Sequence, residues 1–382
     1  MSNLLITIVL LLGVAVIGSN SLVLSPILTD VAADLETTTV AVARSIAAYG
    51  GATALSALFL GFLIDRLGPR TTLLAGGVLL ALAMIGSAAA SSWIMLAAAQ
   101  VLAGLAAGVM LPAIYAVATT TGSEEEGSRI LGRVLTGWSV SLIAGVPLSA
   151  LIADALGWEA SFLALGGLVA VSLVGFWMMP ATPTVSDKVD AGGMWKAVAL
   201  PGIAALLLAQ FFFMTAFYGT YAFFGDHLRE TLGLSAGMAG LVVLFYGIGF
   251  GIAVVGDGVV DRVGPAIILP FALAFVTGAY LVMPVLATWL IGAFFAAFIW
   301  GFANHFVLNV IVLRLSRIGG ERRGAVLGVN SAVTYLGALV GSLLLGAFYS
   351  AFGFFGLAWA GAGSVALALL AVLVGRNQQC LE

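Results

Sequence analysis

Residues Asp65-Arg66-Leu67-Gly68-Pro69 return, at an offset of 196 positions, as Asp261-Arg262-Val263-Gly264-Pro265. Four of the five positions are identical, two of them charged, in a chain whose charged residues make up only 8% of the total. The same offset also aligns single glycines, but such matches have little weight in a chain with 49 glycines. The repeated motif therefore indicates that the chain consists of two homologous halves.

The composition around these motifs is that of a membrane protein. Hydrophobic residues make up 62% of the 382 positions, and the mean hydropathy is +1.18, whereas soluble domains contain about 25% charged residues. A helix needs roughly 20 apolar residues to cross a bilayer, so the chain has room for about twelve spans joined by short loops. The composition thus predicts an all-α membrane protein without a large domain outside the bilayer.

Apolar runs separated by Gly, Pro and charged residues predict twelve transmembrane helices in two pseudo-symmetric six-helix bundles. Residues 1–180 form the predicted N-terminal bundle, 181–196 a cytoplasmic linker, and 197–382 the C-terminal bundle. The predicted spans are residues 4–24, 40–63, 71–90, 93–121, 129–156 and 162–179, followed by 197–224, 236–256, 266–286, 289–315, 324–350 and 354–375.

The distribution of Lys and Arg predicts the orientation, because positively charged loops stay in the cytoplasm. If the N-terminus is cytoplasmic, only Arg44 and Arg229 of the 14 basic residues lie at the outer side. Both termini are therefore predicted to be cytoplasmic, in a bacterial-type inner membrane. The remaining basic residues, all at the cytoplasmic side, are Arg66, Arg70, Arg129, Arg133, Lys188, Lys196, Arg262, Arg314, Arg317, Arg322, Arg323 and Arg376.

The segment Gly61-Phe-Leu-Ile-Asp-Arg-Leu-Gly-Pro-Arg70 resembles the cytoplasmic loop signature of the major facilitator superfamily, and residues 256–264 resemble its second-half copy. Around the fifth span, residues 137–147 and Gly157-Trp158 resemble the drug/proton antiporter and sugar-efflux branch, in which a Gly-Pro pair marks exporters. The resemblance covers the whole chain. It implies alternating access between two bundles, with a substrate cavity lined by the first, fourth, seventh and tenth helices.

Two positions depart from the pattern of that branch. Where the fourth span usually carries an arginine associated with proton coupling, this chain has Gln100. The exporter signature is also degenerate, with Gly145 as the one glycine before Pro147. The resemblance therefore favours export without supplying the usual coupling residue.

Charged residues near the ends of the spans are candidates for gates. In the repeated motif, Asp and Arg side chains can bond a helix terminus, an acidic group or a lipid phosphate; the alternative for the arginines is cytoplasmic anchoring. At the outer side Asp30 can pair with Arg44, for which the alternative is snorkelling to the interface. The predicted gating residues are Gly61, Asp65, Arg66, Arg70, Asp261, Arg262, Asp30, Arg44, Gly145 and Pro147.

His305 is the clearest ionisable residue within a predicted span. With Gly301 and Asn309 it forms an i, i+4 row, so the three residues share one face of a helix. Because histidine gains and loses a proton near neutral pH, His305 is the predicted proton-coupling residue and a substrate contact. The alternative is a neutral histidine bonded to a neighbouring helix.

Amide side chains in the spans should face the protein interior, because an unsatisfied amide is expensive in lipid. The six amides are Asn20, Gln100, Gln210, Asn304, Asn309 and Asn330. All except Asn330 lie on the first, fourth, seventh and tenth helices, which line the cavity in the resembling family. Hydrogen bonding between helices is the alternative for any one of them. The predicted substrate-binding residues are Asn20, Gln100, Tyr115, Trp138, Gln210, Tyr218, Asn304, His305, Asn309, Asn330 and Tyr335.

The sequence contains no nucleotide-binding motif or catalytic triad, and two histidines with one near-terminal cysteine cannot form a conventional zinc site. We therefore expect no enzyme activity, cofactor, metal or nucleic-acid partner, and a monomer in the lipid bilayer. The leading hypothesis is an exporter of small amphipathic compounds, with protons as the coupling ion. The alternatives are an importer or facilitator of a small organic anion and a non-transporting membrane sensor.

Overall fold

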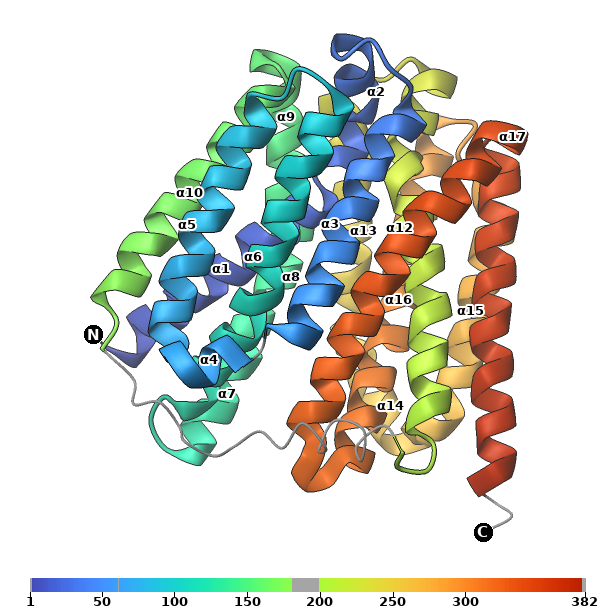
Figure 1. Cartoon of the computed structure of the whole chain (residues 1–382). Helices are drawn as coiled ribbons and strands as arrows, with labels where there is room; N and C mark the ends of the chain where they lie inside the picture. Colours follow the sequence, from blue (N-terminus) through green and yellow to red (C-terminus); the bar gives the residue numbers. More distant parts are fainter. Residues whose placement is uncertain (1, 61, 181–198, 380–382) are drawn as a thin grey trace. The chain divides into compact units, whose positions relative to one another are not determined.

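The computed structural model describes residues 2–60, 62–180 and 199–379 (Figure 1). The regular secondary structure of these residues is all helical, without a β-strand, which confirms the all-helical prediction. Contacts divide the chain into one unit of Met1–Lys188 with Ser235–Gly240 and a second unit of Val189–Leu234 with Leu241–Glu382. The arrangement in two six-helix bundles stays a prediction, and the predicted linker 181–196 lies outside the described residues.

The first unit contains helices whose ends are set by caps and glycines. Ser2, Thr38 and Ser92 accept a backbone hydrogen bond at the start of their helices, while Gly68 and Gly157 adopt positive φ angles of 77° and 93° just before new helices. Its elements are α1 (Asn3–Leu22), α2 (Leu24–Asp34), α3 (Thr39–Phe59), α4 (Phe62–Leu67), α5 (Pro69–Ala88), α6 (Trp93–Thr120), α7 (Glu124–Leu135), α8 (Gly137–Val140), the π-helix η1 (Ser141–Gly145), α9 (Val146–Leu156) and α10 (Trp158–Met178).

Glycines allow α3 and α6 to approach closely. A Cβ atom at Gly104 would lie 2.4 Å from the Tyr49 carbonyl oxygen, and one at Gly108 would lie 2.6 Å from that of Thr53. This spacing of small residues four positions apart is a common device for packing helices in membranes. On its other side α6 packs against α5, and α5 in turn packs against α10 (Figure 1).

The second unit contains longer helices that meet at similar close crossings. A Cβ atom at Gly249 would lie 2.1 Å from the Phe298 carbonyl oxygen, and one at Gly301 would lie 2.0 Å from that of Tyr246. These contacts fix α13 against α16. The elements are α12 (Ile203–Leu232), α13 (Ala236–Ile252, which belongs to this unit from Leu241 on), the 3₁₀ helix η2 (Ala253–Gly256), α14 (Asp257–Val263), α15 (Pro265–Leu286), α16 (Leu290–Gly319), η3 (Gly320–Arg322) and α17 (Arg323–Gln379).

Ten helices among the described residues are long and apolar enough to cross a membrane. One of the ten, Gly324–Gly375, is 52 residues long and is broken by the non-helical backbone of Gly353. The 21-residue helix α3 is not among the ten. Large apolar side chains are also strongly exposed, including Val255 at 88% and Ile291 at 78%, as lipid-facing residues are. The protein is therefore a multi-pass membrane protein, with between ten and twelve crossings in its described part.

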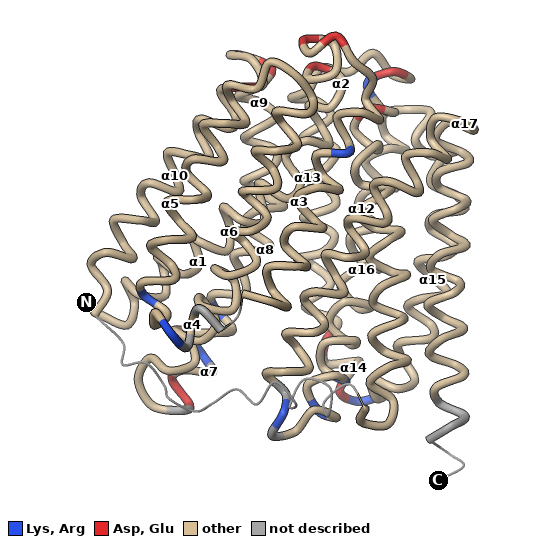
Figure 2. Tube along the Cα trace, viewed as in Figure 1, with Lys and Arg blue, Asp and Glu red and all other residues tan. Residues whose placement is uncertain are grey.

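Charged residues lie mainly near the ends of the helices. In the first unit, arginines gather around α4 and α7, with Arg44 apart from them on α3 (Figure 2). In the second unit, basic residues lie around α14 and the end of α16 (Figure 2). The prediction that these ends are cytoplasmic stays a prediction.

Helix α7 begins with a capping box in which the Ser123 hydroxyl accepts from the Glu126 N–H and the Glu126 carboxylate accepts from the Ser123 N–H, at 3.3 and 3.0 Å. We expect Ser123→Ala to destabilise this helix by about 1 kcal/mol, because one N–H loses its acceptor. Hydrogen exchange of the first α7 amides should accelerate by roughly fivefold. Glu126→Gln is the matched control, since glutamine preserves the box; equal acceleration in both variants would contradict the assignment.

Candidate functional site

A group of aromatic rings surrounds Trp300 in the second unit. Trp300 lies on α16 and is completely buried. Its ring centroid is 4.9 Å from that of Tyr246 on α13 and 5.8 Å from that of Tyr280 on α15. The α12 rings lie 5.7 to 6.2 Å away. The complete set, called the Trp300 cluster below, is Phe217, Tyr221, Phe224, Tyr246, Tyr280 and Trp300.

Asn304 brings an amide to the edge of the Trp300 cluster, one helical turn along α16. Its Nδ2 donates to the Tyr246 hydroxyl at 3.1 Å. Its Oδ1 is buried and, within the residues that the structure describes, has no hydrogen-bond donor. A buried amide oxygen without a donor is costly, so a ligand N–H or O–H would be bound favourably at this position.

Two further amides of the second unit that were predicted to bind substrate also have a buried oxygen without a donor. Gln210 on α12 donates from Nε2 to the Thr334 hydroxyl on α17 at 2.8 Å, while its Oε1 has no donor in the described part of the chain. The Oδ1 of Asn330 on α17 is likewise buried without a donor there. Tyr218 and Tyr335 contact each other, with ring centroids 6.4 Å apart. The Gln210–Thr334 hydrogen bond and the Tyr218–Tyr335 ring contact therefore join α12 to α17.

His305 and Asn309 both bind a carboxylate that the sequence analysis did not select. Nε2 of His305 lies 2.9 Å from Oδ1 of Asp257, and Nδ2 of Asn309 donates to the same oxygen at 3.0 Å. The predicted polar face of α16 is thus directed at the first residue of α14. The sequence contained one signal for Asp257. The 196-residue offset aligns it with Gly61, so the second copy of the motif has a carboxylate where the first has a glycine.

The two amides of the first unit bind each other. Nδ2 of Asn20 donates to Oε1 of Gln100 at 3.1 Å, and Nε2 of Gln100 donates to Oδ1 of Asn20 at 3.4 Å and to the Ser87 hydroxyl at 3.1 Å. All three side chains are buried. This network joins α1, α5 and α6, so it supports the helix-bonding alternative for Asn20 and Gln100.

Residues around the π-helix η1 pack tightly against α1. A Cβ atom at Gly145 would lie 1.9 Å from the Ser19 hydroxyl oxygen, and Pro147 follows in the first turn of α9. The nearby Trp138 donates from Nε1 to the Tyr115 hydroxyl at 3.2 Å. Because π-helical turns are frequent at functional sites, this segment remains a candidate for conformational change.

The predicted inner-gate residues have different surroundings. Gly61 and the side chain of Asp65 lie outside the described residues. Arg70 donates to the carbonyl oxygens of Phe176 and Trp177, the Phe176 bond being 3.4 Å. Arg70 thus binds carbonyl groups in the last turn of α10, where the helix leaves acceptors available. The other three, all exposed, are Arg66, Asp261 and Arg262.

At the predicted outer gate, the Arg44 guanidinium lies over the Trp93 ring, 5.4 Å from its centroid. This cation–π contact fits the interfacial alternative for Arg44. The nearby Asp34 accepts a hydrogen bond from Nε1 of Trp158 at 3.1 Å. The pairing of Asp30 with Arg44 stays a prediction.

Asp226 is a second carboxylate that the sequence analysis missed. It is completely buried on α12, two residues beyond the predicted end of that span. The Tyr349 hydroxyl is shared between Asp226, at 2.9 Å, and Glu230, at 3.3 Å. Asp226 therefore belongs to the interior although its position in the sequence resembled a loop.

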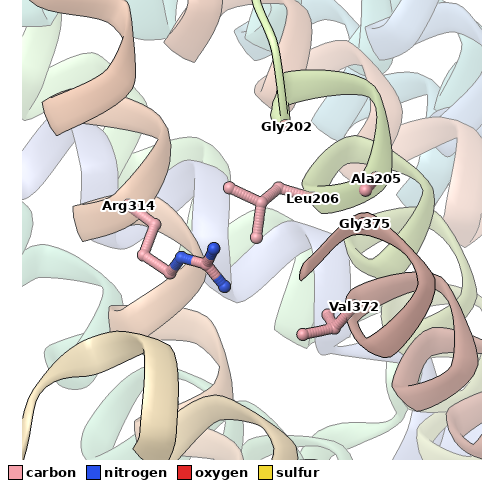
Figure 3. Close-up of a pocket in the computed structure, with 6 residues that line it drawn as sticks. All are labelled: Gly202, Ala205, Leu206, Arg314, Val372 and Gly375. Atoms are coloured by element: carbon pink, nitrogen blue, oxygen red, sulfur yellow. The ribbon is translucent and has the colours of Figure 1, made fainter. Parts of the chain in front are cut away.

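A hollow in the second unit lies away from all these groups. The Arg314 side chain points into it from α16, and the start of α12 and the end of α17 supply the other walls (Figure 3). Its lining contains none of the predicted substrate-binding residues. The six lining residues are Gly202, Ala205, Leu206, Arg314, Val372 and Gly375.

Long apolar helices around buried polar and aromatic groups define an α-helical membrane protein of the kind that carries solutes. A sequence model of the Major Facilitator Superfamily matches residues 10–317. The chain therefore belongs to this superfamily, as the motifs predicted, and is a membrane transporter.

Three relatives show the range of the similarity. The uncharacterized MFS-type transporter YwfA of Bacillus subtilis is 30% identical over 358 residues, covering 92% of this chain and 87% of the relative. A chloramphenicol resistance protein of Streptomyces lividans is 26% identical over 377 residues, 94% of either chain. The arabinose-proton symporter of Escherichia coli is 35% identical over 121 residues, 32% of this chain and 25% of the symporter.

Proposed function

We propose that the protein exports small, uncharged amphipathic compounds across a bacterial inner membrane by alternating access. The observation that carries this proposal is the Trp300 cluster with Asn304 at its edge. Aromatic rings provide a large apolar surface, and the Asn304 Oδ1 provides a buried acceptor that a ligand N–H or O–H can satisfy. Because the cluster is buried, the compound enters only when the transporter changes conformation.

Export is supported by the resistance protein of Streptomyces lividans, because its similarity covers 94% of this chain, whereas that to the sugar symporter covers 32%. An organic anion suits the site less well. An anion would need positive charge in the site, and two side chains that could supply it are otherwise engaged, Arg44 with the Trp93 ring and His305 with the Asp257 carboxylate. We therefore do not propose import of an organic anion, and the transport experiment distinguishes it from export.

The test uses purified protein in liposomes with imposed pH and voltage gradients, and radiolabelled chloramphenicol, L-arabinose and benzoate as probes. We expect gradient-dependent chloramphenicol movement in the export direction. Uptake of benzoate or arabinose alone would replace export with import, and binding of chloramphenicol without movement would favour a sensor.

Asn304→Leu should lower chloramphenicol transport by about tenfold, because it removes a hydrogen-bond acceptor from the site. Phe295→Leu is the matched control, since Phe295 lies on the same helix α16 and is 56% exposed. Equal transport by the two variants would remove Asn304 from the site.

A further inference from the structure

We infer that the Trp300 cluster and Asn304 select aromatic compounds with a hydrogen-bond donor at one end and an acceptor at the other, and that Trp300 Nε1 recognises the acceptor. This inference rests on the proposed function and names the class of substrate. Trp300 and Asn304 are residues i and i+4 of α16, so they share one face of that helix and are about one turn, or 5.4 Å, apart.

The Trp300 indole carries a donor for which the described part of the chain has no acceptor. Its Nε1 is buried and makes no hydrogen bond there, and an indole nitrogen can only donate. The Tyr280 ring from α15 packs edge to face on the indole, at an angle of 75° and a centroid distance of 5.8 Å. A ligand oxygen that binds Nε1 would therefore satisfy an N–H that burial makes costly.

Two hydroxyl groups join Nε1 at this end of the cluster. The Tyr280 hydroxyl lies beside both the Trp300 indole and the Thr220 hydroxyl. Both hydroxyl oxygens are buried, and neither meets a partner with hydrogen-bond geometry within the described residues. The backbone of α17 closes this side, because a Cβ atom at Gly361 would lie 3.1 Å from Thr220 Oγ1 and 3.1 Å from Tyr280 Cδ1. Trp300, Tyr280 and Thr220 are called the donor end below.

The donor end suits a neutral acceptor with more than one oxygen lone pair, such as a nitro, sulfonyl or carbonyl group. Hydroxyl groups can donate as well as accept, so all three side chains can bond such a group. None of the three is charged, and an unpaired carboxylate would be costly to bury among them. This chemistry agrees with the uncharged compounds of the proposed function.

Asn304 forms an end of opposite character. Its Nδ2 donates to the Tyr246 hydroxyl at 3.1 Å, while its buried Oδ1 meets no donor in the described chain. An amide oxygen accepts and cannot donate, so Asn304 Oδ1 calls for a ligand hydroxyl or N–H. Tyr246 connects the two ends, since its ring lies 4.9 Å from that of Trp300 between centroids.

The first unit has little comparable polar capacity. Among its described residues that are not exposed, only Ser45 has a buried side-chain polar atom without a hydrogen-bond partner. The buried amides Asn20 and Gln100 satisfy each other. The second unit therefore supplies the polar selectivity for the compound through the donor end and Asn304.

The test measures equilibrium binding to the full chain in lipid nanodiscs, with empty nanodiscs used to subtract compound dissolved in the bilayer. The probes are para-nitrobenzyl alcohol, which has a donor and an acceptor, benzyl alcohol, which lacks the nitro acceptor, and para-nitrotoluene, which lacks the hydroxyl donor. We expect para-nitrobenzyl alcohol to bind about tenfold more tightly than either of the others. Equal binding of all three would overturn the inference.

Each variant should lose only the preference that belongs to its own end. Trp300→Phe keeps an aromatic ring without an N–H, so it should no longer prefer para-nitrobenzyl alcohol to benzyl alcohol but should still prefer it to para-nitrotoluene. Asn304→Leu should show the reverse pattern. Trp359→Phe, at a position that is 59% exposed, is the matched control and should keep both preferences. An unchanged preference for the nitro group in Trp300→Phe would overturn the role of Nε1.

Nuclear magnetic resonance of ¹⁵N-indole-labelled protein gives a second readout. The signal that is missing from Trp300→Phe belongs to Trp300 Nε1–H, and we expect para-nitrobenzyl alcohol to shift it downfield while benzyl alcohol leaves it in place. A signal that bound para-nitrobenzyl alcohol does not shift would overturn the assignment. Both preferences without transport of any compound would retain the site and exclude export. Chloramphenicol export without either preference would retain the proposed function and overturn this inference.

Discussion

Trp300→Ala is expected to lower the free energy of unfolding by about 3–5 kcal/mol, because it removes a fully buried indole and leaves a cavity. The loss should be near the upper end of that range. Trp300 contacts rings from α12, α13 and α15, so three helices lose their common packing partner at once. The measurement is unfolding of the purified protein in a mixed detergent series, followed by tryptophan fluorescence and circular dichroism.

Trp359→Ala provides the matched control, because Trp359 lies in the same unit but is 59% exposed. We expect this variant to unfold within about 0.5 kcal/mol of wild type. Trp300→Phe should lose less than the alanine variant, since most of the ring volume remains. Chloramphenicol binding should be lost in Trp300→Ala and weakened in Trp300→Phe. Equal stability of Trp300→Ala and Trp359→Ala would show that the Trp300 cluster does not hold these helices together.

The helices could be predicted closely where apolar runs end at strong local signals. The predicted span 93–121 is α6, Trp93–Thr120, because Ser92 caps its start. The predicted span 266–286 is α15, Pro265–Leu286, which follows the left-handed turn at Gly264. Both boundaries depend on residues adjacent in sequence.

Internal breaks were not predicted, because hydropathy does not report them. The span 129–156 was predicted as one helix, but the structure divides it into α7, α8, the π-helix η1 and α9. The π-helical turn occurs where α1 approaches Gly145 most closely. That break arises from contacts between segments more than 100 residues apart.

The candidate site could be predicted in its residue types but not in its pairings. His305 was selected because an ionisable group in an apolar helix is rare, whereas Asp257 was overlooked because it lies in a motif assigned to a loop. Asp226 was overlooked because it lies two residues beyond the predicted end of its span, although the helix α12 continues to Leu232. Which acceptor a side chain reaches depends on the crossing of two helices, and one sequence does not reveal that geometry.

A double-mutant cycle tests whether Asn20 and Gln100, the two amides of the first unit, join helices or contact the substrate. Gln100→Leu should destabilise the protein by about 1–3 kcal/mol, because the Asn20 amide is left buried without its partner. Asn20→Leu should have a loss of the same order, since it strands the Gln100 amide. The double variant leaves neither amide, so its loss should be smaller than the sum by about 0.5–3 kcal/mol.

The double-mutant cycle is measured by unfolding and repeated for chloramphenicol transport. Ser87→Ala is the control within the network, because it removes only the acceptor of one Gln100 hydrogen bond and should cost about 1 kcal/mol. Strictly additive losses would show that the pair does not stabilise the packing of α1 against α6. If the stable double variant fails to transport, Asn20 and Gln100 contact the substrate; if it transports normally, their predicted substrate contact is wrong and they serve only to join helices.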